Sequence, residues 1–154
     1  MTDSPTADKG ADHREVRLTR TGHAEFDATS VRGGTIHVGS GEGTDFTPVE
    51  LLLTAIAGCS AIDVDFITGK RAEPVHFEVV SSGQKRKDAE RGSHMGDLEV
   101  TFTVRFPEGE AGDRAREMLP RAITMSHDRL CTVSRTVQLG TPVAMGVTDP
   151  GETA

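Results

Sequence analysis

The chain has 154 residues, a length that predicts one domain able to bury a single adequate core. With 17 Lys and Arg against 24 Asp and Glu its formal net charge is −7, and it contains no Trp or Tyr. A basic face for a phosphate backbone and a large aromatic platform for stacked bases are therefore not expected, so no nucleic acid partner is predicted.

The N-terminus is polar and lacks the apolar centre of a signal peptide. The longest apolar run, Leu51 to Ile62, stops at Asp63 and is too short to span a bilayer, so no membrane partner is predicted. We expect a cytoplasmic protein whose two cysteines are reduced thiols or redox groups rather than a permanent disulfide. Residues 1–13 and 149–154 are expected to be disordered tails around one domain over residues 14–148.

Alternating apolar and polar residues predict a small antiparallel meander at the start of the domain. Its strands are expected over residues 15–20, 25–30 and 35–38, with a turn at Arg32-Gly33-Gly34. The glycine-rich segment 39–46 lacks the spacing and the Lys of a phosphate-binding loop, so we predict a plain loop there.

The segment TPVELLLTAIAGCSAIDVDF predicts a long central helix. Thr47 suits the N-cap, Pro48 the first helical position, and Glu50 the closing position of a capping box. The helix should end at Thr68-Gly69. Because it is apolar nearly all round, we expect it to be buried on most sides.

The second half of the chain predicts two strands, two helices and a last strand. The two strands are expected over residues 75–81 and 97–106, joined by a charged loop over 83–96. A helix over 112–129 should be kinked or divided by Pro120, and a short helix from Thr132 should stop at Gly140. With a final strand over 141–147, the order of elements indicates an α+β fold.

Cys59 lies near the middle of the long helix, where the commoner role is that of a small buried hydrophobe. It is well past the first turn, so the dipole of its own helix does little for its thiolate, and a cation would have to supply the stabilisation. Asp63 shares its face and would raise the pKa of the thiol unless it is itself paired, for which an Arg is the best partner. A structural ion pair or a solvent-facing helix end explains Asp63 equally well.

Cys131 directly precedes the short helix, so the free backbone N–H groups of Thr132 to Ser134 and the charge of Arg135 would favour its thiolate. A plain helix-capping cysteine is the open alternative. The spacing of the two cysteines does not decide whether they meet. His127 and Cys131 are four residues apart, but no second pair stands at ligand spacing, so no metal or other cofactor is predicted.

The motifs TPVELLLTAIAGCSAID and SHDRLCTVSRT, in this order, resemble the OsmC/Ohr family of osmotically induced and organic hydroperoxide resistance proteins over about residues 14–147. The resemblance implies antiparallel sheets packed around two long central helices in an intertwined homodimer. It implies an antioxidant stress-response peroxidase for organic hydroperoxides, with Cys59 as the attacking thiol and Cys131 as the resolving thiol. A dithiol or thioredoxin-like reductant would restore both.

The resemblance also implies an Arg from the N-terminal strands that activates Cys59, held by a Glu at the helix start. Peroxidase branches carry that Glu directly after the Pro, whereas here it comes one residue later, at Glu50. A shift of one position along a helix turns the side chain by about 100° around the helix axis. The form PxEL…GCSAID is closer to a less characterised branch of the family. Arg20 is the first candidate for the activating Arg and Arg32 the second.

The predicted catalytic residues are thus Cys59, Cys131, Arg20 and Glu50. Two alternatives stay open. One is an OsmC-like dimer that senses redox state or binds a small ligand without efficient peroxidase turnover. The other is a structural dimer in which the two cysteines serve only as core and cap.

Overall fold

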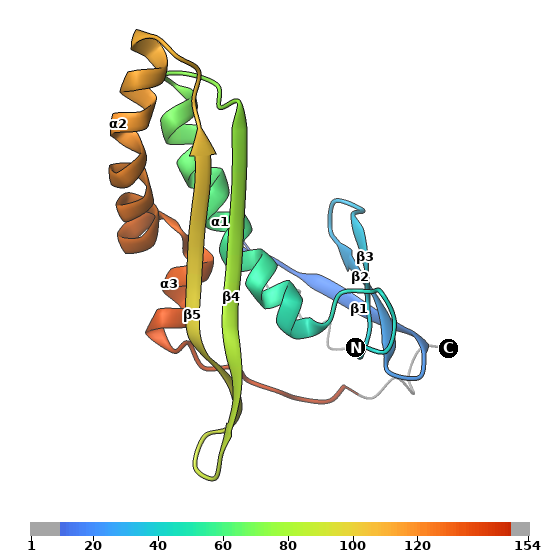
Figure 1. Ribbon diagram of the computed structural model, residues 1–154. Helices are drawn as coiled ribbons and strands as arrows, with labels where there is room; N and C mark the ends of the chain where they lie inside the picture. Colours follow the sequence, from blue (N-terminus) through green and yellow to red (C-terminus); the bar gives the residue numbers. More distant parts are fainter. Residues whose placement is uncertain (1–9, 149–154) are drawn as a thin grey trace. The chain divides into compact units, whose positions relative to one another are not determined.

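The computed structural model describes residues 10–148 of the chain. Of the predicted tails, 1–13 and 149–154, residues 1–9 and 149–154 lie outside this range. Two compact units make up the fold, one ending at Leu52 and the other beginning at Leu53. Helix α1 (Pro48–Gly69) contains the boundary between them (Figure 1). The single domain over residues 14–148 stays a prediction.

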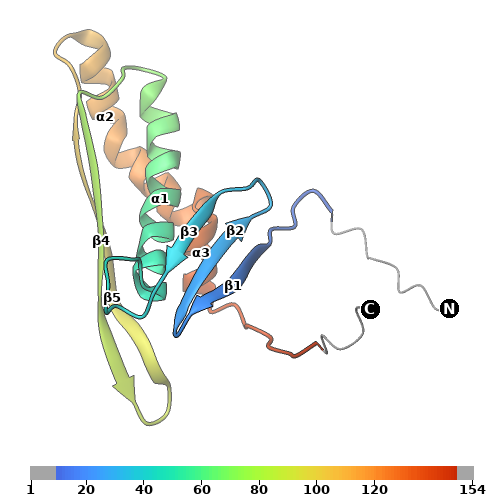
Figure 2. The ribbon, with the colours of Figure 1, turned by 90° about the vertical axis from the view of Figure 1, so that its right-hand side faces the viewer.

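The first unit contains the predicted meander. Strands β1 (Val16–Gly22), β2 (Glu25–Ser30) and β3 (Thr35–Val38) form an antiparallel sheet in the order β1-β2-β3 (Figure 2). The register pairs Arg20 with Phe26. The chain turns between β1 and β2 with Ala24 at φ 56°, and the meander prediction is confirmed.

Helix α1 begins as its sequence predicts. The N–H and hydroxyl of Thr47 donate to the Glu50 carboxylate at 2.7 and 2.9 Å. The N–H of Glu50 donates back to the Thr47 hydroxyl at 3.3 Å, which completes the capping box. The helix ends at Gly69, so both ends agree with the prediction.

The expected burial of α1 on most sides is wrong for the single chain. Its buried residues form one stripe at intervals of four: Ile56, Ser60, Val64 and Thr68. Ile62 and Phe66 lie on other faces and are 59% and 71% exposed. The apolar residues of a helix indicate which faces it can bury, but the number of faces that are buried depends on which other elements pack against it.

By length and composition, α1 could cross a membrane, with a mean hydropathy of 1.7 in its most apolar window. The sequence-based exclusion rested on a shorter run that ended at Asp63, whereas the helix continues to Gly69. A single such helix is weak evidence for a membrane span, because the core helix of a soluble protein has the same length and composition.

Strands β4 (His76–Asp88) and β5 (Gly92–Arg105) of the second unit form a long antiparallel hairpin (Figure 1). The predicted loop over 83–96 is wrong, because most of it is paired, for example Gln84 with Gly96 and Lys87 with Ser93. The register shifts between Ser82 and Gln84. This part of the hairpin is largely polar on both faces, so it lacks the apolar alternation that would have indicated strands.

Helix α2 (Glu110–Met125) follows the hairpin and runs through Pro120 without a break, so the predicted division there is wrong. The missing N–H of Pro120 removes only one intrahelical hydrogen bond. A π-helix, η1 (Ser126–Leu130), continues the chain to Cys131. Helix α3 (Thr132–Leu139) then ends as predicted at Gly140, which has φ 62°.

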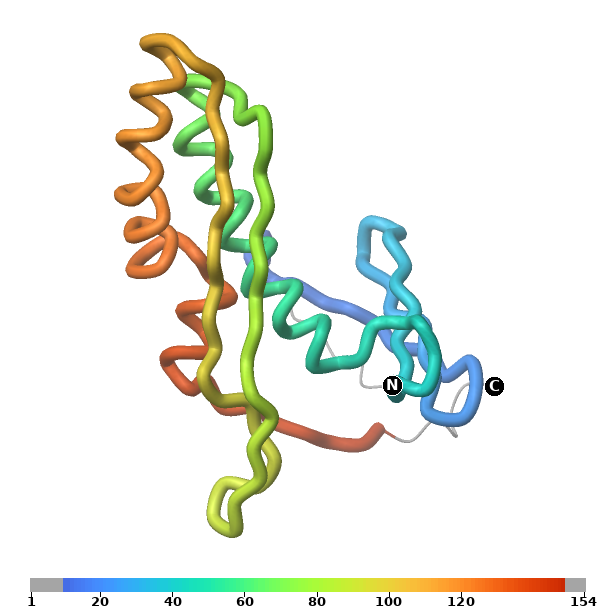
Figure 3. The backbone as a smooth tube through the Cα atoms, viewed as in Figure 1, coloured from blue at the N-terminus to red at the C-terminus, as the bar shows by residue number. Residues whose placement is uncertain are grey.

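The predicted last strand is also wrong, because residues 141–148 have no regular secondary structure (Figure 3). Val143, Met145 and Val147 are 80%, 94% and 96% exposed. Their alternation would suit a strand, but a strand forms only beside a partner, and no other described segment pairs with them.

Within the second unit, α1 and α2 lie on the same face of the β4–β5 hairpin (Figures 1 and 2). Alternate residues of β5 face the helices: Val100, Phe102 and Val104 are half-buried and Phe106, just past the strand, is buried, while Leu98 is exposed. The fully buried residues of this unit include Val64, Ala115, Ala122 and Cys131.

Candidate functional site

The two cysteines meet inside the second unit. Cys59 is half-buried on α1, and Cys131 is fully buried at the N-cap of α3. Both are free thiols, and the Cys131 side chain lies within hydrogen-bonding reach of the Cys59 sulfur. The fold therefore joins two residues whose contact the sequence left open.

The N-terminus of α3 faces both sulfur atoms. The N–H of Ser134 donates to Cys131 Sγ at 3.3 Å, and the N–H of Val133 donates to the Cys59 sulfur. The hydroxyl of Ser60 also donates to Cys131 Sγ, at 3.5 Å. Backbone donors and the positive end of the helix dipole favour negative charge on sulfur.

The predicted donors to Cys131 are confirmed at Ser134, but the donor to Cys59 was missed. The local sequence points only to the dipole of α1, and α1 begins too far from Cys59 for that dipole to help. The N–H of Val133 comes from α3, and no local signal around Cys59 indicates that α3 packs against it.

Burial nevertheless raises the pKa of the Cys59 thiol. The hydrogen bond from the Val133 N–H opposes this effect, while the Cys131 thiol and the Asp63 carboxylate add to it. None of these contributing groups is a cation. Stabilisation of a Cys59 thiolate therefore needs a positive charge besides them.

Asp63 anchors the segment that carries Cys131. The hydroxyl of Ser126, 1% exposed, donates to Asp63 Oδ2 at 2.9 Å. The carbonyl of Ser126 accepts the N–H of Cys131 at 2.9 Å and closes the π turn. Among the described residues, the hydrogen-bond partner of Asp63 is thus this serine and not the predicted arginine.

The other predicted site residues belong to the first unit. Arg20 lies on β1, and Arg32 lies in the turn between β2 and β3. Hydrogen bonds from the Thr47 N–H and hydroxyl lower the pKa of Glu50, so this carboxylate is an anion within its capping box. A place beside Cys59 for any of the three stays a prediction.

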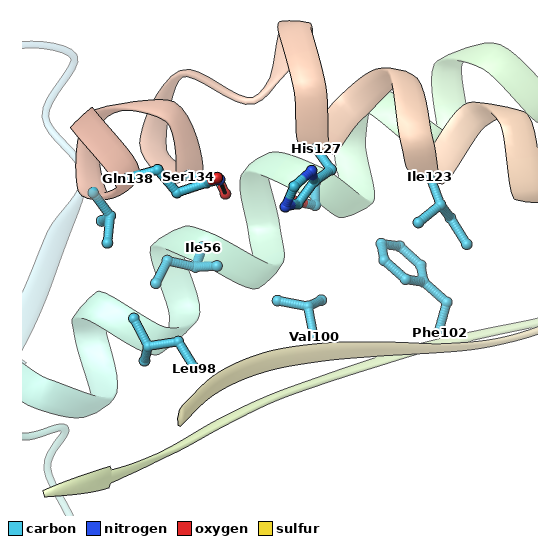
Figure 4. A pocket seen from close by; sticks show the side chains of 10 residues that line it. Ile56, Leu98, Val100, Phe102, Ile123, His127, Ser134 and Gln138 are labelled. Atoms are coloured by element: carbon cyan, nitrogen blue, oxygen red, sulfur yellow. Dashed lines mark hydrogen bonds between the residues drawn. The ribbon is translucent and has the colours of Figure 1, made fainter. Parts of the chain in front are cut away.

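A cavity of about 370 Å³ is lined by Ser60 and Ser134, the two serines that hydrogen-bond the Cys131 sulfur (Figure 4). Neither thiol lines it. Its walls are apolar on the hairpin side and carry polar groups on the helix side: Ile56, Ser60, Leu98, Val100, Phe102, Ile123, His127, Ser134, Val137 and Gln138. Within residues 10–148 no group of three His, Cys, Asp or Glu side chains could hold a metal ion.

Comparison with known proteins gives consistent matches. The sequence model for OsmC-like proteins matches residues 41–146. Uncharacterised proteins of Mycobacterium tuberculosis and Mycobacterium bovis are each 33% identical over 140 residues, which cover 89% of this chain and 98% of theirs.

Among solved structures, a hypothetical protein from Aquifex aeolicus has 26% identity and a TM-score of 0.66, over 84% of this chain and 90% of that chain. An OsmC-like protein from Vibrio cholerae has 12% identity and a TM-score of 0.70, over 82% and 94%. The organic hydroperoxide resistance protein OhrB of Bacillus subtilis has 17% identity and a TM-score of 0.51, over 80% and 90%. At 12% and 17% identity, the last two structures show only that the fold is similar.

Proposed function

This chain belongs to the OsmC-like protein family and has its α+β fold, and we propose that it is a thiol-dependent peroxidase that reduces organic hydroperoxides. The observation that carries the proposal is the pairing of Cys59 and Cys131 at the N-terminus of α3. Solved proteins of the same fold that are named for organic hydroperoxide resistance agree with it.

The proposed reaction uses the two thiols in turn. The Cys59 thiolate attacks the terminal oxygen of the hydroperoxide, the O–O bond breaks, and the alkoxide takes a proton to leave as an alcohol. Cys59 is now a sulfenic acid. The Cys131 sulfur attacks it, a disulfide forms, and water is released. A dithiol or thioredoxin-like reductant supplies two electrons and two protons to restore both thiols.

The half-burial of Cys59 and the full burial of Cys131 suit this order of events. A peroxide can reach the more exposed sulfur, while the resolving thiol is shielded from the peroxide. The backbone donors of Val133 and Ser134 stabilise negative charge on either sulfur as it develops.

We propose that Arg20, or Arg32 in its place, provides the cation that Cys59 lacks. Glu50 would orient that guanidinium with its carboxylate while it caps α1. Because one carboxylate has two oxygens with several acceptor sites, both tasks are chemically compatible.

We also propose a cytoplasmic homodimer. The support is the apolar surface of α1 that the single chain leaves exposed, including Ile62 and Phe66. Large exposed apolar side chains on a long helix are typical of a surface that another chain covers. Elution of the wild type at the monomer volume in size exclusion, with full activity, would contradict the dimer.

The test of the peroxidase is the consumption of cumene hydroperoxide with dithiothreitol as reductant. Cys59→Ser should lose nearly all activity, whereas Cys131→Ser, in the absence of dithiothreitol, should still react once and accumulate a sulfenic acid that dimedone traps. Equal consumption by Cys59→Ser and the wild type would refute the proposal.

One observation favours the alternative of a redox sensor, namely the raised pKa of Cys59. A thiol that is largely protonated at neutral pH reacts slowly with peroxide. A sensor would consume about one equivalent of peroxide per chain during the assay, whereas an enzyme would consume many equivalents.

A further inference from the structure

The cavity beside the thiols has the size and composition of a small-molecule site. Its volume of about 370 Å³ falls within the range of about 300–1,000 Å³ that is typical of ligand pockets. Figure 4 shows Leu98, Val100 and Phe102 rising from the hairpin, with His127 and Ser134 on the opposite, helical side. An apolar wall facing a few polar groups suits an amphipathic ligand.

Two unused hydrogen-bond donors lie next to each other in this cavity, on α3. Gln138 Nε2 donates to Ser134 Oγ at 2.9 Å, so the Ser134 hydroxyl proton and the second Gln138 amide proton are available to a ligand. Asp128 Oδ1 engages Nδ1 of His127 at 2.7 Å, so Nε2 is the ring nitrogen left for a ligand. Donors attract acceptor oxygens, and a carboxylate is the strongest such group.

Residues that line this cavity also contact Cys131. Ser60 and Ser134 line it, and both hydrogen-bond the Cys131 sulfur, Ser60 through its hydroxyl and Ser134 through its N–H. A molecule in the cavity therefore contacts the serines that hold the thiol without reaching either sulfur. It would be a regulator rather than the reacting peroxide.

We propose that this cavity binds a small amphipathic carboxylic acid and that its occupancy slows the attack of Cys131 on an oxidised Cys59. The apolar body would lie against Val100 and Phe102, with the carboxylate at Ser134 and Gln138. A carboxylate there places a negative charge near the Cys131 sulfur and so disfavours a second negative charge on that sulfur. Only the physiological meaning of this control rests on the proposed peroxidase.

Binding is tested first, on the reduced protein by calorimetry, with decanoate and 1-decanol as probes. Decanoate should bind at least about tenfold more tightly than decanol. Val100→Phe fills the cavity and should weaken decanoate binding at least about tenfold. The control is Val104→Phe, the same change on the same face of β5 but outside the cavity lining, and it should leave decanoate binding unchanged. Gln138→Leu, at an exposed position, should remove most of the preference for decanoate over decanol.

Unchanged decanoate binding in Val100→Phe would overturn the site. Should Val100→Phe not fold, the Gln138→Leu variant decides, because an unchanged preference there would overturn the carboxylate position. Equal binding of the two probes to the wild type would overturn the choice of an acid.

The effect on Cys131 is tested without peroxide. In protein that carries glutathione on Cys59, the Cys131 thiolate attacks the Cys59 sulfur, the mixed disulfide breaks, and glutathione leaves as a thiolate while the Cys59–Cys131 disulfide forms. Saturating decanoate should slow glutathione release several-fold in the wild type and not in Val100→Phe. An unchanged rate in the wild type would overturn the control of Cys131, whether or not the chain is a peroxidase.

Discussion

Replacement of Ser126 by Ala should destabilise the segment that positions Cys131. The change deletes a hydroxyl that is 1% exposed and donates to Asp63 at 2.9 Å. Hydrogen bonds to charged groups contribute about 1.5–3 kcal/mol, and water can partly replace this one because Asp63 is only half-buried. We therefore expect a loss of about 1.5 kcal/mol, which corresponds to a drop in Tm of about 3–6 °C for a chain of this size.

Urea unfolding followed by circular dichroism would measure this loss, on reduced protein at one fixed concentration because assembly shifts apparent stability. A double-mutant cycle with Asp63→Asn should give a coupling energy near 1 kcal/mol or more. Ser93→Ala, at an exposed position of the hairpin, is the matched control and should stay within about 0.5 kcal/mol of the wild type. Wild-type stability of Ser126→Ala with a coupling energy near zero would refute the anchoring role.

Three further predictions concern charge and backbone geometry. Asp63→Asn should move the midpoint of Cys59 alkylation by iodoacetamide to lower pH, because the carboxylate raises the pKa of that thiol; an upward shift would contradict this. Capping lowers the pKa of Glu50, so its charge stabilises the fold above the unfolded-state pKa of about 4.3 and this gain is lost as pH falls through the folded-state value. Glu50→Gln keeps the capping hydrogen bonds, so its stability deficit at pH 7 should shrink as the pH falls through the folded-state pKa of Glu50, and a deficit independent of pH would argue against the charge. Gly112→Ala should cost at least about 3 kcal/mol in urea unfolding, since a Cβ there would lie 1.7 Å from the Pro107 carbonyl oxygen; near-wild-type stability would mean that this backbone contact yields.

Several features could be predicted because their causes lie close together in the sequence. The capping box of Thr47 and Glu50 needs only four consecutive residues, and the end of α3 needs only Gly140 at a left-handed position. The meander follows from alternation with period two. Cys59 and Cys131 were singled out by the motifs around them.

Other predictions failed where a distant partner decides the outcome. The polar part of the hairpin forms strands because each strand pairs with the other, while the apolar alternation after Thr141 forms none because no described segment lies beside it. Pro120 stays within α2, although proline alone predicts an interruption. The expected burial of α1 was too high for the same reason, since Phe66 is 71% exposed among the described residues.

The sequence by itself determined the local elements, the ends of α1 and the identity of the two thiols, because backbone preferences and caps depend on adjacent residues. Only the tertiary structure decided that Cys59 meets Cys131, that the Val133 N–H reaches Cys59, and that Ser126 rather than an arginine partners Asp63. Each of these contacts joins α1 to a segment that follows α2. Such contacts arise when helices pack, and packing is set by the burial of whole faces rather than by any short motif.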